Sequence, residues 1–216
     1  MRVFINGFGR IGRSVLRAWA ERPEAWPGLV IVGINDIAAP DMCAYLFSYD
    51  STFGPWRGTV ELWEGALVVN GHVLPLHRLA DISSLDLAGV DVVLECTGRA
   101  DTAEVAGRGL QAGARRVLVS GPSAAAEVTV VLGANEGMLR DQRIVSNASC
   151  TTNALAPLVR LLDQDWGVET GSMTTIHCYT GSQPTVDAPA ADFARSRAAA
   201  LSMVPTTTSA QRLLDR

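Results

Sequence analysis

Apolar and polar positions along the chain follow two periods, one typical of buried strands and one typical of amphipathic helices. Short apolar runs predict strands at residues 2–5, 29–34, 92–97, 116–119 and 128–132. Helical patterns are found between or after these runs, at residues 13–22, 41–48, 103–111 and 154–166. Strands that alternate with helices are typical of a doubly wound sheet. The pattern therefore predicts an α/β protein with a mostly parallel sheet.

A second group of short strands is predicted at residues 59–62, 66–69 and 73–76. Asn70-Gly71 lies between the last two, and this dipeptide favours a tight hairpin turn. His72 and His77 flank Pro75 in the same stretch, where we expect them to be solvated sheet positions.

Three glycines stand in a GxGxxG pattern between the first predicted strand and the first helix, at Gly7, Gly9 and Gly12. In a dinucleotide-binding turn the first glycine allows the tight turn and the second lets the backbone approach a pyrophosphate. The third lets helix and strand pack closely, and the helix N-terminus faces the phosphates. A glycine turn in another α/β fold is the alternative.

Asp36 supports the dinucleotide interpretation, because it ends the second predicted strand at about the ~20-residue distance expected for a ribose-binding acid. A carboxylate there can accept hydrogen bonds from both ribose hydroxyls of NAD and would repel the extra phosphate of NADP. We expect the strand ends at Gly7, Asn35, Thr97 and Ser120 to meet at one crevice, where such folds bind ligands.

Cys150 lies where a loop of small polar residues, Ser146–Thr152, leads into the helix predicted at 154–166. Unpaired backbone N–H groups and the helix dipole stabilise a thiolate at such a position. Ser149, Thr151 and Thr152 can cap the helix, and their hydroxyls and amides can hold an anion. A buried, inert cysteine beside an ordinary N-cap fits the same segment.

His177 is the histidine best placed to act as a base for Cys150. It ends an alternating run, residues 171–177, that predicts a strand, and it opens into a polar loop that carries Gly181 and Pro184. A Cys and a distant His that meet in space are the usual pair of thiol catalysis.

Composition excludes several classes of protein. The chain is 48% hydrophobic and 19% charged, as in globular proteins, and its net charge of −4 offers no basic stripe for nucleic acid. Cys43, Cys96, Cys150 and Cys178 show no CxxC pair and no zinc-ligand spacing, so no metal site is expected. Their scatter, the lack of a signal peptide and the lack of a ~20-residue apolar stretch predict a cytoplasmic protein that does not enter a membrane.

A nicotinamide site combined with an activated thiol suits aldehyde oxidation through a cysteine hemithioacetal and a thioester. The chain resembles phosphorylating glyceraldehyde-3-phosphate dehydrogenase in five segments: Asn6–Gly12, Ile34–Ile37, Tyr49–Gly54, Ser146–Asn153 and Arg195–Ala200. The resemblance implies that Cys150 is the nucleophile and that His177 is its base and thiolate partner.

The resemblance also implies roles for other residues. Positions that line the NAD cofactor are Gly7, Gly9, Arg10, Ile11, Gly12, Asp36, Arg78, Thr97 and Ser120. Positions around the substrate and the attacking phosphate are Ser149, Thr151, Thr180, Arg195, Thr208 and Ser209. The alternative for Arg195, as for Arg197, is a contact with a neighbouring subunit.

The activity implied is NAD-dependent oxidative phosphorylation of glyceraldehyde 3-phosphate to 1,3-bisphosphoglycerate, with inorganic phosphate as co-substrate, in a homo-oligomer that is a tetramer in the family. The domains expected are a Rossmann-type NAD-binding domain at 1–149 and an incomplete α+β catalytic domain at 150–216, because family members continue well past Pro205. The alternatives are oxidation of erythrose 4-phosphate without phosphorolysis and a truncated, inactive NAD-binding fragment.

Overall fold

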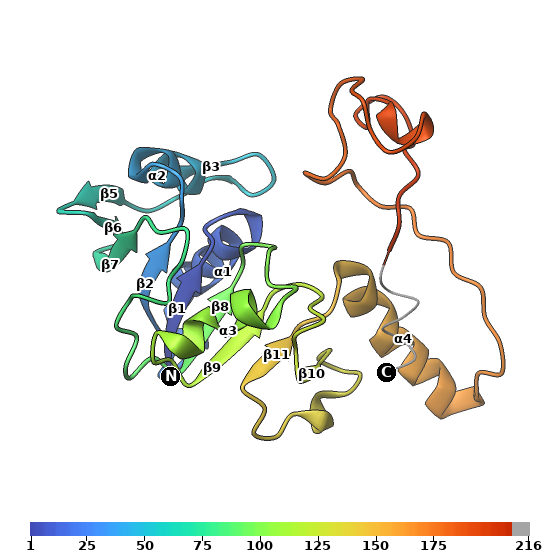
Figure 1. Ribbon diagram of the computed structural model, residues 1–216, viewed down its shortest axis with the longest axis horizontal. Coiled ribbons are helices and arrows are strands. Elements are labelled where there is room, and N and C mark those ends of the chain that lie inside the picture. The colour runs from blue at the N-terminus through green and yellow to red at the C-terminus, as the bar shows by residue number, and fades with distance from the viewer. Residues whose placement is uncertain (209–216) are drawn as a thin grey trace. The chain divides into compact units, whose positions relative to one another are not determined.

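A computed structural model describes residues 1–208 of the chain (Figure 1). The chain divides into two compact units, residues 1–148 and residues 149–216. The first unit is built around a nine-stranded sheet, and the second begins with a long helix.

The sheet has the strand order β10-β11-β9-β8-β1-β2-β7-β6-β5. Its strands are β1 (Arg2–Asn6), β2 (Val30–Asn35), β5 (Val60–Trp63), β6 (Ala66–Val69), β7 (His72–His77), β8 (Val92–Glu95), β9 (Arg116–Val119), β10 (Val128–Thr129) and β11 (Ile144–Ser146). All pairs from β10 to β7 are parallel, whereas β5, β6 and β7 pair antiparallel. The mostly parallel, doubly wound α/β fold is therefore confirmed.

The central strand β1 lies between β2 and β8, and the chain crosses from one side of β1 to the other. Such a reversal of strand order creates a crevice at the carboxyl ends of the strands. The predicted turn at Asn70 and Gly71 joins β6 to β7, and both residues have positive φ, 49° and 80°. A short antiparallel pair, β3 (Tyr49–Asp50) and β4 (Gly54–Pro55), lies outside the main sheet.

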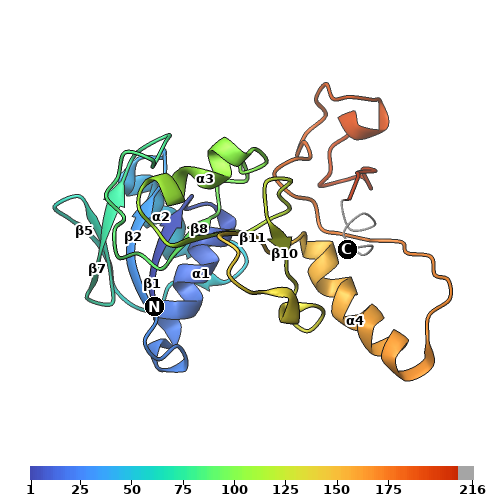
Figure 2. The same cartoon turned by 60° about the horizontal axis from the view of Figure 1, so that its bottom comes forward.

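Helices cover both faces of the sheet. They are α1 (Arg10–Glu21), α2 (Pro40–Ser48) and α3 (Ala103–Gln111), with 3₁₀ turns η1 (Pro23–Ala25) and η2 (Glu136–Met138). Figure 2 shows α1 and α3 on opposite sides of β1 and β8. Alternate side chains of β1 serve the two cores, because Ile5 packs with Leu16 of α1 while Phe4 packs with Ala106 of α3.

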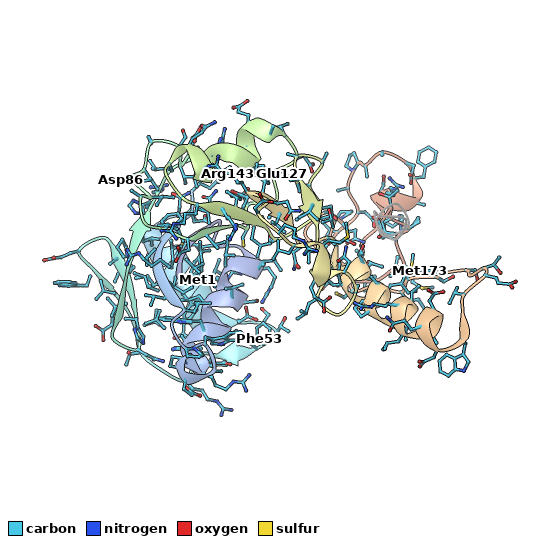
Figure 3. All side chains as sticks on the ribbon, turned by 90° about the horizontal axis from the view of Figure 1, so that it is seen from below. Met1, Phe53, Asp86, Glu127, Arg143 and Met173 are labelled. Carbon is cyan, nitrogen blue, oxygen red and sulfur yellow. The ribbon has the colours of Figure 1, made fainter. Side chains whose placement is uncertain are left out.

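The second unit begins with α4 (Cys150–Trp166), which ends at Gly167 with φ 74°. Beyond it, residues 171–180 adopt neither helix nor strand, and a 3₁₀ turn, η3 (Ala194–Ser196), follows. Figure 3 shows Met173 on the extended segment that follows α4. No helix within residues 1–208 is long and apolar enough to cross a membrane.

Two predictions about the second unit are corrected. The strand expected at residues 171–177 is wrong: a strand needs a partner for its backbone hydrogen bonds, and residues 149–208 contain no strand with which it could pair. Helix α4 begins at Cys150 and not at Ala154, because Ser149 caps it. Cys150 is thus the first residue of the helix.

Candidate active site

A pocket of about 450 Å³ lies at the carboxyl ends of β1, β2 and β8. The expected strand-end residues Gly7, Asn35 and Thr97 line it, together with Gly9 and Asp36. Its remaining lining residues are Asn6, Ile37, Leu79, Ala80, Glu95, Cys96, Arg99, Val105 and Arg108. All of them belong to the first unit.

The three glycines of the turn meet different surroundings. A Cβ on Gly7 would lie 2.7 Å from the backbone nitrogen of Thr97, and its φ is +94°. A Cβ on Gly12 would overlap the carbonyl oxygen of Gly7, so the helix could not approach the strand as it does. A Cβ on Gly9 would meet no protein atom within 4 Å. The protein's own packing therefore does not require glycine at position 9, whereas a pyrophosphate against the backbone would.

Asp36 is held in place by two backbone donors. The amide of Phe8 donates to its Oδ2 at 2.6 Å, and the amide of Ala38 donates to its Oδ1 at 2.8 Å. These bonds fix a half-buried carboxylate at the edge of the pocket, where a ribose can reach its remaining lone pairs. The N-terminus of α1 has no side-chain cap and no acidic residue in its first turn, which suits an approaching phosphate.

A buried polar network forms the floor of the pocket. Glu95 is 3% exposed, and its Oε2 accepts a hydrogen bond from Asn6 Nδ2 at 2.5 Å. Its Oε1 accepts hydrogen bonds from the backbone amide and the hydroxyl of Thr97. Asn35 Nδ2 donates to Asn6 Oδ1 at 2.8 Å, so side chains at the ends of β8, β1 and β2 are linked. This network was not predicted from the sequence, in which the polar residues that end apolar strands are its only signal.

Five of the expected cofactor residues do not line the pocket: Gly12, described above, and Arg10, Ile11, Arg78 and Ser120. Arg10 pairs with Asp50 at 2.5 Å, and Ile11 is exposed. Arg78 Nε donates to the carbonyl of Ile37, a residue that lines the pocket, at 3.0 Å. The amide of Ser120 donates to the carbonyl of Glu95 at 3.0 Å.

The second unit presents its cysteine at the start of α4. Ser149 Oγ accepts a hydrogen bond from the amide of Thr152 at 3.1 Å, as an N-cap should. Cys150 follows in the first turn and is exposed, so the inert, buried alternative does not apply. The positive end of the helix dipole therefore acts directly on an accessible thiol.

Cys150 and His177 lie in direct contact: the Sγ of Cys150 is 3.2 Å from the Nε2 of His177. The Nδ1 of His177 lies 2.6 Å from the carbonyl oxygen of Cys178. Because a carbonyl oxygen can only accept, Nδ1 carries a proton and donates it there. The backbone thus orients the imidazole so that Nε2 faces the sulfur.

This contact shifts the pKa values of both residues. Partial burial raises the pKa of Cys150, but hydrogen bonds from His177 and Thr151 and the imidazolium charge outweigh it and lower that pKa below the usual value. The pKa of His177 is raised by its hydrogen bond to the Cys178 carbonyl and then by Cys150. Both shifts favour a thiolate–imidazolium pair.

The two cysteines of the first unit, Cys43 and Cys96, have pKa values shifted in the opposite direction. Burial raises the pKa of Cys43 to about 11, and burial likewise raises the pKa of Cys96 to about 11. These thiols stay protonated near neutral pH, whereas the Cys150 thiol is available as a nucleophile.

Of the expected phosphate-binding residues, Ser149 and Thr151 flank Cys150 at the start of α4. Thr151 contacts Cys150, and Thr180 donates to Gln183 Oε1 from both its amide and its hydroxyl. Arg195 pairs with Asp192 at 3.3 Å. Thr208 is exposed, and Ser209 lies outside the described residues. Within residues 1–208, no group of three or more His, Cys, Asp and Glu side chains is arranged to hold a metal ion.

The doubly wound sheet, the glycine turn and the acid-edged pocket define a dinucleotide-binding α/β protein of the Rossmann type. Comparison with known families agrees with this class. The family model described as glyceraldehyde 3-phosphate dehydrogenase, NAD binding domain, matches residues 1–103, and the model of the C-terminal domain of the same enzyme matches residues 149–215. The chain belongs to the glyceraldehyde-3-phosphate dehydrogenase family, and NAD is the cofactor of its first domain.

Individual relatives give the same result. The chain is 44% identical to glyceraldehyde-3-phosphate dehydrogenase of Clostridium pasteurianum, over 99% of this chain and 64% of that protein. It is 46% identical to the same enzyme of Kitasatospora aureofaciens, over 99% of this chain and 64% of that protein. It is 43% identical to the cytosolic enzyme of Leishmania mexicana, over 100% of this chain and 65% of that protein. The chain thus spans less than two thirds of the length of these relatives.

Proposed function

We propose that this chain carries the cofactor site and the thiol site of a phosphorylating glyceraldehyde-3-phosphate dehydrogenase, which converts glyceraldehyde 3-phosphate to 1,3-bisphosphoglycerate. The observation that carries the proposal is the 3.2 Å contact between Cys150 Sγ and His177 Nε2 at the N-terminus of α4. A thiolate held there is a nucleophile for an aldehyde carbon, with a base already in contact.

The residues act in sequence on the substrate. The imidazolium of His177 protonates the aldehyde oxygen as Cys150 Sγ adds to the aldehyde carbon, which gives a hemithioacetal. The Nε2 of His177, now neutral, then takes the proton of that hydroxyl as the carbon is oxidised. NAD, when bound, supplies the hydride acceptor that this oxidation needs. The product on Cys150 is a thioester, and inorganic phosphate attacks its carbonyl carbon, releases the acyl phosphate and frees the thiolate.

The residues proposed to hold NAD combine three kinds of group. Gly7, Gly9 and Gly12, with the start of α1 at Arg10 and Ile11, form the pyrophosphate turn. Asp36 binds the ribose, and Arg78, Thr97 and Ser120 complete the set; of these three, Thr97 lines the pocket. The fit of Gly9 and Asp36 to a dinucleotide supports this assignment.

Substrate and inorganic phosphate are proposed to bind hydroxyls and one guanidinium, which suit phosphate oxygens. These residues are Ser149, Thr151, Thr180, Arg195, Thr208 and Ser209. We also propose a cytoplasmic homo-oligomer, a tetramer as the resemblance implies; the name of the Leishmania mexicana relative places that protein in the cytosol. Arg195 and Arg197 would serve a subunit contact under the alternative assignment.

The test is NAD reduction by the purified chain with glyceraldehyde 3-phosphate, with and without inorganic phosphate. We expect phosphate-dependent turnover that Cys150→Ser abolishes and Cys43→Ser retains. Turnover with erythrose 4-phosphate that does not need phosphate would favour the second substrate. Stoichiometric NAD binding without oxidation of either aldehyde would identify an inactive NAD-binding fragment and overturn the proposal.

A further inference from the structure

His177 contacts a second thiol besides that of Cys150. The Sγ of Cys178 lies 3.6 Å from His177 Nδ1, while the Sγ of Cys150 lies 3.2 Å from Nε2 of the same ring. The imidazole ring therefore lies between two sulfurs. Both cysteines are exposed, and neither forms a disulfide in the structure.

We propose that Cys150 and Cys178 form a peroxide-induced disulfide, with Cys150 as the thiol that is oxidised and Cys178 as the thiol that resolves it. This proposal rests on the proposed function in one respect: both use the contact between Cys150 and His177. The oxidant is a hydroperoxide, ROOH. Accessible thiolates that lie next to a second cysteine are the usual targets of such reversible oxidation.

The first step oxidises Cys150. Its thiolate sulfur attacks one peroxide oxygen, so that an S–O bond forms as the O–O bond breaks and the sulfur becomes a sulfenic acid. The other oxygen is reduced and leaves as an alkoxide or hydroxide. The proton on His177 Nε2, 3.2 Å from the sulfur, neutralises that leaving group.

The second step forms the cross-link. The Cys178 sulfur attacks the Cys150 sulfur, so that an S–S bond forms and the S–O bond breaks. The departing hydroxide takes the proton of the Cys178 thiol and leaves as water. Two thiols and one peroxide thus give one disulfide, one water and one alcohol or second water.

The segment that carries Cys178 can make the approach that this bond requires. A disulfide brings its sulfurs to about 2.05 Å, so the imidazole must move out from between them. Residues 171–180 belong to no helix or strand, and every one of them is exposed. Rotation of the His177 and Cys178 side chains therefore displaces no buried packing.

Peptide mass spectrometry tests the proposal independently of aldehyde oxidation. The chain contains no lysine, and trypsin cleaves after Arg143, Arg160 and Arg195, so the two cysteines fall in separate peptides, 144–160 and 161–195. After hydrogen peroxide treatment of the purified chain, we expect these peptides to be joined, and dithiothreitol to separate them. The thiols of Cys43 and Cys96 should remain free.

Cys178→Ser and Cys178→Ala change an exposed side chain and should fold normally. Without the resolving thiol, Cys150 should accumulate as sulfinic and sulfonic acid, at least about tenfold above the amount in the unmodified sequence. Val186→Ala, an exposed position in the same long loop, serves as the matched control and should cross-link normally.

Equal over-oxidation of Cys150 with and without Cys178 would overturn the proposal, as would a cross-link between two chains on a non-reducing gel. A failed dehydrogenase assay would not affect this readout, because the joined peptide is detected without substrate or NAD.

Discussion

At the scale of single residues, Glu95 places a buried carboxylate at the floor of the pocket. A buried carboxylate is costly unless donors surround it, and here three donors do so: Asn6 Nδ2 and the amide and hydroxyl of Thr97. These bonds tie the loop after β8 to the end of β1, directly beneath the pocket. Glu95 therefore positions the turn on which Thr97 lies.

We predict that Glu95→Gln both destabilises the chain and weakens NAD binding. An amide cannot accept at both ends, so one of the donors on Asn6 or Thr97 loses its acceptor, at a cost of about 1–3 kcal/mol. Urea unfolding would measure the change in free energy, and calorimetric titration would measure the Kd for NAD. Glu61→Gln, on the exposed strand β5, is the control and should change neither. Unaltered NAD binding in Glu95→Gln would show that the network does not shape the pocket.

The pair formed by Cys150 and His177 yields a pH-dependent prediction. Because the pKa of Cys150 is lowered, alkylation by iodoacetamide should begin below the pH at which ordinary thiols react. His177→Asn removes the stabilising cation, so the pKa should rise and the rate at pH 7 should fall on the order of tenfold. His72→Asn, an exposed histidine of the first unit, should leave the profile unchanged. The same pH dependence of the alkylation rate in the unmodified chain, His177→Asn and His72→Asn would contradict a thiolate stabilised by His177.

At the scale of elements, the turn between β1 and α1 contains one glycine that packing requires and one that only ligand binding requires. Gly12 is required by the close contact of the helix with Gly7, whereas Gly9 faces open space in the pocket and has φ −72°, which any residue can adopt. Two glycines of one motif are thus constrained by different things: one by the protein itself and one by what enters the pocket.

Alanine substitutions should resolve this difference. Gly12→Ala forces α1 away from β1 and should cost about 1–3 kcal/mol in the free energy of unfolding. Gly9→Ala should change that free energy by less than about 1 kcal/mol, yet raise the Kd for NAD by about tenfold, or ~1.4 kcal/mol. Gly107→Ala, in α3 where a Cβ meets no other atom, is the helical control and should be neutral or stabilising. If Gly9→Ala lowered the free energy of unfolding as much as Gly12→Ala does, the assignment of Gly9 to NAD binding and of Gly12 to packing would be refuted.

Some of the strands and helices could be predicted from the sequence and others could not. The strands at residues 2–5, 66–69 and 116–119 were predictable because their apolar runs are buried in the two cores, which residues of the neighbouring helices α1, α2 and α3 share. The strand at 171–177 was not, because alternation specifies a face but supplies no partner strand. Helix α4 was predicted four residues too short, since Ser149 caps it ahead of Cys150.

The same distinction applies to the site. The contact of Cys150 with His177 could be anticipated because each residue stands at the end of a recognisable local pattern. Glu95 and Asn6 could not, because only the register of β1 against β8 places them side by side. Arg108 was missed for a similar reason, since it belongs to the pocket only through the packing of α3 on the sheet.

At the scale of the whole molecule, burial is distributed unequally between the two units. Both hydrophobic cores consist of residues from the first unit, from Val3 to Ile144. Within residues 149–208, only Thr152 and Ala198 are buried, while Trp166 and Phe193 are 77% and 95% exposed. The hydrophobic free energy that stabilises the fold therefore belongs to residues 1–148.

A fragment of residues 1–148 should consequently fold and bind NAD by itself. Every residue that lines the pocket lies between Asn6 and Arg108, and no member of either core is removed by the cut. We expect cooperative urea unfolding of the fragment and a Kd for NAD within about threefold of that of the 216-residue chain, a difference below ~1 kcal/mol. Gly9→Ala introduced into the fragment should weaken binding as it does in the longer chain, which would show that both use the same pocket. A fragment that unfolds without cooperativity would mean that the second unit stabilises the sheet, and a folded fragment that no longer binds NAD would mean that the second unit completes the cofactor site.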